Sequence, residues 1–65
     1  MDPNAAWANL TTPFWDLGTR IESGYALLDW LEGGGFVPAD MPVSRRPDAI
    51  REVKLWINSL EERKS

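Results

Sequence analysis

Carboxylates are the residues of this chain whose type and spacing could support acid–base catalysis or hold a cation. Asp29 and Glu32 stand about one helical turn apart, and Glu22 precedes Asp29 by about two turns. Paired carboxylates can act as general acid and base or bind a metal. Because the chain has no His and no Cys to join them, we interpret them as a solvated helix face. The sequence predicts no catalytic residue, no metal ligand and no cofactor, and hence a protein that is not an enzyme.

Three consecutive glycines, residues 33–35, invite comparison with a phosphate-binding loop. A Walker loop needs Gly-Lys-Ser/Thr entering a helix after a strand. Here the glycines follow a predicted helix and no Lys is near. We therefore predict a left-handed helix C-cap, with Phe36 folding back onto the last helical turn.

A basic cluster marks the start of the last predicted helix. DNA-reading helices often carry basic residues there, so a small DNA-binding transcriptional regulator is one hypothesis. However, the net charge of the chain is −3, unlike most nucleic-acid binders. We favour intramolecular salt bridges and solvated charge, with an acidic protein partner or nucleic acid as the alternatives. The cluster consists of Arg45, Arg46, Arg51 and Lys54.

The charge is unevenly placed along the chain. Residues 1–40 carry six acidic side chains and one basic, a net charge of −5. Residues 41–65 carry six basic and four acidic side chains, a net charge of +2. Opposite charges of this kind favour docking of the last helix onto the earlier part of the chain.

Four tryptophans are the main apolar resource of this short chain, since it has no disulfide to stabilise it. Most of them are expected in the core, and any that stay exposed are expected to be hot spots for a partner protein. Leu55 falls on the side of the last helix away from its predicted apolar face, which consists of Ile50, Val53, Ile57 and Leu60. The predicted partner-binding residues are Trp15, Trp30, Leu55 and Trp56.

The elements that position these residues are three helices. Asp2-Pro3 predicts a short first helix over about 3–10, and Thr12-Pro13 predicts a long central helix over about 13–32, since Asp and Thr are N-cap residues and Pro suits the first turn. The last helix is predicted over about 45–63, either capped by Ser44 or beginning at Pro47. The fold class is all-α, a small three-helix domain spanning residues 1–65.

The central helix is predicted to have two apolar faces. Trp15 and Trp30 mark one face, which is either core or surface. Gly18 and Gly24 predict close approach of a neighbour, or else a break near Gly18 that makes residues 13–17 a separate turn. The other face, spaced 3-4-4-3 as on one side of a helix, is predicted to be core and consists of Phe14, Leu17, Ile21, Tyr25 and Leu28.

The stretch between the last two helices is predicted to be a packed crossover rather than a linker. Pro38 and Pro42 lack a backbone hydrogen-bond donor, and Asp40 suits a turn. The apolar residues expected to lie across the helices are Phe36, Val37, Met41 and Val43.

The segment Leu27–Pro38, which reads Leu-Leu-Asp-Trp-Leu-Glu-Gly-Gly-Gly-Phe-Val-Pro, resembles a segment of small, mostly uncharacterised helical proteins of high-GC bacteria and their phages. The resemblance covers 12 of the 65 residues and implies a bacterial or phage source. It implies no activity and no functional residue.

Three functional hypotheses follow. The first is a non-enzymatic protein–protein interaction module, such as a phage or bacterial accessory or inhibitor protein. The second is the DNA-binding regulator, and the third is a self-associating structural protein, a homo-oligomer. Because no secretion signal and no apolar run of about 20 residues occurs, we expect a cytoplasmic protein that does not engage a membrane.

Overall fold

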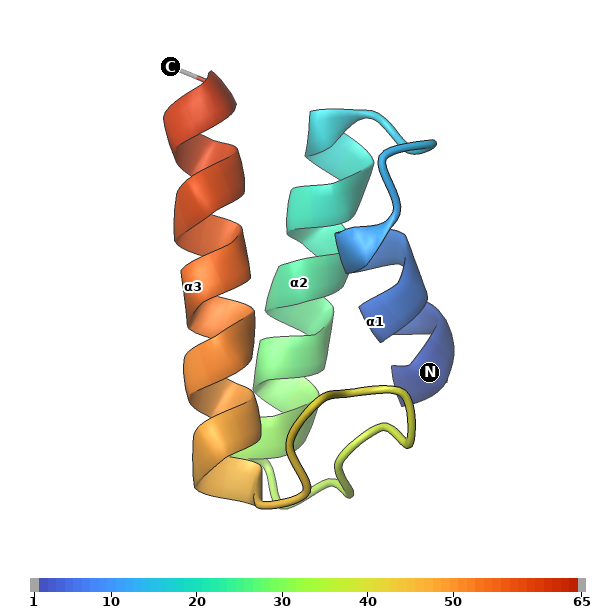
Figure 1. Cartoon of the computed structure of the whole chain (residues 1–65), viewed down its shortest axis with the longest axis vertical. Coiled ribbons are helices and arrows are strands. Elements are labelled where there is room, and N and C mark those ends of the chain that lie inside the picture. The colour runs from blue at the N-terminus through green and yellow to red at the C-terminus, as the bar shows by residue number, and fades with distance from the viewer. Residues whose placement is uncertain (1, 65) are drawn as a thin grey trace.

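Three helices make up the computed structural model, which describes residues 2–64. They are α1 (Pro3–Thr11), α2 (Leu17–Glu32) and α3 (Arg46–Lys64). Figure 1 shows α2 between the other two, with α3 running alongside it in the opposite direction and the shorter α1 on its other side. The predicted all-α, three-helix fold is confirmed.

Side chains close both ends of α1. The Asp2 carboxylate is the N-cap and accepts a 3.0 Å hydrogen bond from the backbone N–H two residues on. At the other end, the hydroxyls of Thr11 and Thr12 donate to carbonyls of the last turn. The buried Arg20 donates from Nε to the Leu10 carbonyl at 3.1 Å. Its positive charge thus lies at the negative end of the α1 dipole, so a residue of α2 stabilises the end of α1.

The central helix begins four residues later than predicted, and a separate turn precedes it. Its N-cap is Asp16, because the Thr12 hydroxyl is bonded back to Ala8 and so closes α1 instead of opening α2. The prediction that Thr12 and Pro13 start this helix is wrong. The alternative of a separate turn is nearer to the structure.

The buried face of α2 differs from the predicted one. Phe14 is 81% exposed and Tyr25 48% exposed, while only Ile21 of the predicted stripe is buried. The predicted stripe was counted from Phe14, which lies outside the helix and does not share its phase. The prediction of a Phe14–Leu28 core is therefore wrong at Phe14 and Tyr25, whereas Leu17 and Leu28 are partly buried against the core. The buried residues of α2 are Arg20, Ile21, Gly24, Leu27 and Leu31.

All three helices meet at Gly24. A β-carbon added there would lie 2.7 Å from Ile57 Cγ1 of α3 and 3.0 Å from Leu10 Cδ1 of α1. The predicted close approach is confirmed at Gly24. It is wrong at Gly18, which is exposed and faces only the carboxylate of Asp16.

The glycines end α2 as predicted. Gly33 is the C-cap, and Gly34 adopts a left-handed φ of 98°. The Gly34 N–H donates to the Leu31 carbonyl at 3.1 Å, and the Gly35 N–H donates to the Trp30 carbonyl at 2.8 Å. This pair of bonds is the Schellman arrangement, which satisfies carbonyls that the helix end leaves without partners.

The crossover between α2 and α3 is packed, as predicted. Pro38 and Met41 are buried, and the Ala39 N–H donates to the Asn4 side chain at 2.9 Å, which ties the crossover to α1. The prediction that Phe36 packs across the helices with the rest of the crossover is wrong, because Phe36 is 60% exposed. The crossover fixes the start of α3 relative to both other helices.

The last helix matches its predicted bounds to within one residue and places its predicted apolar face inward. Leu55 is 57% exposed on the opposite side. The buried residues of α3 are Ala49, Val53, Ile57 and Leu60.

Within residues 2–64, no helix combines the length and hydropathy that a membrane span needs.

Candidate interaction surface

The four predicted partner-binding residues do not form one surface. Trp15 precedes α2 and Trp30 lies in its last turn, about 20 Å away along a helix of that length. Leu55 and Trp56 lie on α3 and line one shallow hollow. The predicted helical face joining Trp15 to Trp30 is therefore absent, because Trp15 is not helical.

The turn before α2 exposes two adjacent aromatic rings. Phe14 is 81% and Trp15 43% exposed, and their rings meet edge to face with centroids 5.2 Å apart. The backbone N–H of Trp15 donates to the Thr12 carbonyl at 3.4 Å. We name residues 13–16 the aromatic turn. Sequence analysis missed the exposure of Phe14, because its apolar character matched the helical pattern of α2.

Asp16 fixes the exit of the aromatic turn. Its carboxylate accepts a hydrogen bond from the Thr19 hydroxyl. This bond holds the pKa of Asp16 below its ordinary value of 3.8. The ionised carboxylate also lies at the positive end of the α2 dipole, so its charge stabilises the start of the helix.

We expect Asp16→Asn to remove part of the acid sensitivity of the fold. The depressed pKa means that the unfolded chain binds this proton more readily, so the charge contributes stability above pH 3.8 and loses it as pH falls through the folded-state pKa. Asn keeps an acceptor oxygen but has no proton to bind. In thermal melts followed by circular dichroism, the advantage of the wild type over Asp16→Asn should shrink as pH falls below 3.8. A constant difference would contradict the assignment.

The Trp30 side chain stabilises the C-terminal end of α2. Its Nε1–H donates to the Phe36 carbonyl at 3.0 Å, and the two rings meet edge to face with centroids 5.4 Å apart. The predicted folding of Phe36 back onto the last turn is thus confirmed. A β-carbon on Gly35 would lie 2.3 Å from the indole, so the chain passes directly against this ring. Trp30 is therefore a structural residue of the cap.

The outer side of α3 holds a hollow of about 300 Å³ beside Leu55. Leu55 is exposed, and Trp56 is half-buried because its ring meets the edge of Trp7 of α1, with centroids 6.2 Å apart. Trp56 thus joins α3 to α1 on one side and lines the hollow on the other. The hollow is lined by Leu55, Trp56, Ser59 and Arg63.

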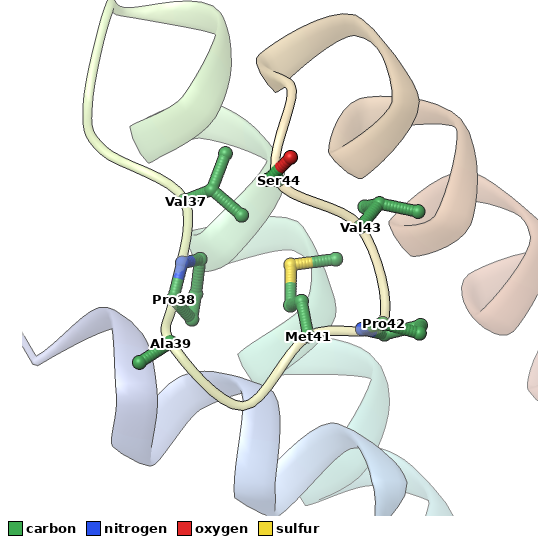
Figure 2. A pocket seen from close by; sticks show the side chains of 7 residues that line it. All are labelled: Val37, Pro38, Ala39, Met41, Pro42, Val43 and Ser44. Carbon is green, nitrogen blue, oxygen red and sulfur yellow. The ribbon is translucent and has the colours of Figure 1, made fainter.

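A second hollow, of about 320 Å³, lies inside the curve of the crossover. Figure 2 shows the side chains of Val37, Pro38 and Met41 pointing toward its interior. None of its lining side chains ionises, so this hollow offers apolar contact rather than acid–base chemistry. Its lining residues are Val37, Pro38, Ala39, Met41, Pro42, Val43 and Ser44.

The predicted basic cluster is spread around α3. Lys54 lines the groove between α2 and α3. The Arg46 guanidinium instead lies near Gly34, just after the end of α2. Among residues 2–64 no carboxylate pairs with Arg45, Arg46, Arg51 or Lys54. The four side chains are exposed, as predicted for solvated charge, but the predicted intramolecular salt bridges are absent in this part of the chain. Nucleic-acid binding stays a prediction.

The carboxylates considered for chemistry face solvent. Glu22, Asp29 and Glu32 are exposed. Within residues 2–64, no group of three or more acidic side chains lies close enough to share a metal ion.

Comparisons of the chain with protein-family models, curated proteins and solved structures found no match.

Proposed function

We propose that this chain is a non-enzymatic protein–protein interaction module that binds another protein through its aromatic turn. The observation that carries the proposal is the exposure of Phe14 and Trp15 side by side. Burying a whole aromatic side chain removes about 150–250 Å² from solvent, and Phe14 still exposes 81% and Trp15 43% of its surface for a partner to cover. Trp is also among the residues that contribute most to interface energies.

The aromatic turn is held in place before any partner arrives. Hydrogen bonds of Thr12 fix the chain just before the turn, and the hydrogen bond between Asp16 and Thr19 fixes the chain where the turn ends. Pro13 further restricts the backbone. A pre-ordered turn loses little conformational entropy on binding, so more of the contact energy appears as affinity.

The charges around the turn indicate what the partner offers. Residues 1–40 carry a net charge of −5, and their one basic side chain, Arg20, is buried. Asp16 and Glu22 are exposed in and after the turn. The partner that fits has an apolar pocket for the two rings and a basic rim around it.

The proposal extends to the source and the cellular location of the protein. The resemblance of Leu27–Pro38 to small bacterial and phage proteins supports an accessory or inhibitor protein of a bacterium or phage. The lack of Cys suits a cytoplasmic location. The lack of both His and Cys supports a role without catalysis.

Replacing Phe14 and Trp15 by Ala is expected to weaken partner binding at least about tenfold, since each ring acts as a hot spot. A photo-crosslinking amino acid at position 14 identifies the protein that contacts the turn in host extract. Binding of that purified protein to wild type, Phe14→Ala/Trp15→Ala and Leu55→Ala is then measured by calorimetry. Leu55→Ala is the matched control, because it removes an exposed apolar side chain elsewhere. Equal affinities of all three proteins would refute the proposal, provided that circular dichroism shows each to be folded.

A further inference from the structure

We propose that the outer face of α3 is a self-association surface, on which a second copy of this chain packs its own α3 in the antiparallel direction. This surface is separate from the aromatic turn, so the inference does not rest on the proposed function. In Figure 1 the outer side of α3 faces away from both other helices.

A stripe with the spacing of a coiled-coil seam runs along this face. Its residues are spaced 4-3-4, which keeps them on one side of a helix and matches the seam of paired helices. All four are exposed, opposite the buried face of α3. They are Arg51, Leu55, Asn58 and Glu62.

The hollow beside Leu55 indicates how a second helix fits. Its lining extends from Leu55 to Arg63, so its centre lies about one turn beyond Leu55 toward the C-terminus. Helices pair when a side chain of one enters such a hole on the other. If Leu55 of each copy enters the hollow of the other, Leu55 lies level with Ser59 of the second copy. Only antiparallel helices related by a two-fold axis near residue 57 satisfy this condition twice.

The same alignment brings opposite charges together. A two-fold axis perpendicular to the helices places each flank of the stripe against the same flank of the second copy. Along the stripe Arg51 then lies level with Glu62 of the second copy. On the flank that carries the hollow, which Arg63 lines, Glu52 lies level with Arg63 of the second copy. Both pairs centre within one residue of position 57, the position that the hollow independently indicates.

The parallel arrangement lacks this agreement. It places Arg51 level with Arg51 of the second copy, and Glu62 level with Glu62, along the seam. Parallel helices also align their dipoles unfavourably, whereas antiparallel helices place opposite ends together. Charge complementarity therefore selects the antiparallel dimer.

The dimer is expected to be weak, because Leu55 is the only fully apolar side chain on the stripe. A contact of this size falls at the low end of specific interfaces. We expect a dissociation constant between about 1 µM and 1 mM.

Charge reversal tests both the surface and its direction. Residues 51 and 62 lie about 16 Å apart along one helix, so they do not contact each other within one chain. Arg51→Glu and Glu62→Arg are each expected to weaken the dimer about tenfold, because each places two like-charge pairs in it. The double variant Arg51→Glu/Glu62→Arg should return to within about threefold of the wild type.

Sedimentation equilibrium over micromolar to millimolar concentrations measures each dissociation constant. Leu55→Ala should lower the fraction of dimer, whereas Phe14→Ala should leave it unchanged, which separates this surface from the aromatic turn. The swap Glu52→Arg/Arg63→Glu repeats the test independently, should Glu62→Arg disturb the contacts that Glu62 makes within its own chain. A wild type that stays monomeric at millimolar concentration overturns the proposal. So does a dimer that the single charge reversals do not weaken, the result expected of a parallel pair, in which every variant keeps two like-charge pairs. A dimer that the single reversals weaken and neither double swap restores overturns it as well.

Discussion

Replacing Gly24 by Ala is expected to lower the free energy of unfolding by about 1–2 kcal/mol, although Ala favours helix over Gly by about 1 kcal/mol. The added β-carbon would lie 2.7 Å from Ile57 Cγ1 and 3.0 Å from Leu10 Cδ1. Cγ1 is held close to the α3 backbone, so helices rather than a flexible side-chain tip must move apart. Overpacking of this kind costs about 1–3 kcal/mol, and here the cost falls at the upper end.

Gly18 provides the matched control, because it lies in the same helix on the exposed side. A β-carbon there meets only the side-chain tip of Asp16, at 3.2 Å. We expect Gly18→Ala to stabilise the protein by about 0.5–1 kcal/mol. Denaturant unfolding followed by circular dichroism measures both variants. If Gly24→Ala proves as stabilising as Gly18→Ala, the helices do not meet at Gly24 as described.

Replacing Arg20 by Met is expected to cost about 2–3 kcal/mol of stability. Met preserves an unbranched apolar chain of similar length, so the substitution removes mainly the guanidinium. That group is buried and bonded to the Leu10 carbonyl, and a hydrogen bond to a charged group contributes about 1.5–3 kcal/mol. The same substitution removes a positive charge from the C-terminal end of α1. For a domain of this size the melting temperature should fall by roughly 10 °C or more.

Arg45→Met serves as its control, because Arg45 is exposed and pairs with no carboxylate in the described residues. Its stability should change by less than about 0.5 kcal/mol. Arg20→Lys should be intermediate, since it keeps the charge but lacks the Nε donor. Hydrogen exchange should show the loss of protection first in α1. Equal stability of Arg20→Met and Arg45→Met would exclude this role of Arg20.

The helix signals in the sequence had unequal predictive power. Asp2-Pro3 starts α1 as predicted, and the Asp2 carboxylate accepts the cap hydrogen bond from the Asn4 backbone N–H. Thr12-Pro13 carries a similar signal, yet the Thr12 hydroxyl turns back to α1 and the next acid, Asp16, caps α2. Which of two neighbouring caps is used depends on how the preceding helix ends, and a local pattern does not contain that information.

The core face of α2 could not be read from hydropathy because two of its members are not hydrophobic. Arg20 is buried through its bond to α1, and Gly24 is buried because its missing side chain admits Leu10 and Ile57. Both facts depend on residues distant in sequence. In α3, where Val53 and Ile57 are ordinary apolar residues, the predicted face is confirmed.

The candidate surface was predictable in part. The position of Leu55 opposite the core of α3 follows from helical periodicity alone. Trp15 and Trp30 could not be distinguished by residue type, although one is an exposed member of the aromatic turn and the other is bonded to the Phe36 carbonyl. That difference arises from the turn before α2 and the glycine cap after it, both outside the regular helix.

The edge-to-face contact between Trp7 and Trp56 also provides a spectroscopic signal for the docking of the helices. These rings belong to the first and last helices, so their fixed mutual orientation exists only while α1 and α3 are docked around α2. Their contribution to near-ultraviolet circular dichroism should vanish when the helices separate, whereas the far-ultraviolet signal persists as long as the helices themselves remain. Docking and helix formation can therefore be followed separately, in one sample and without an added label.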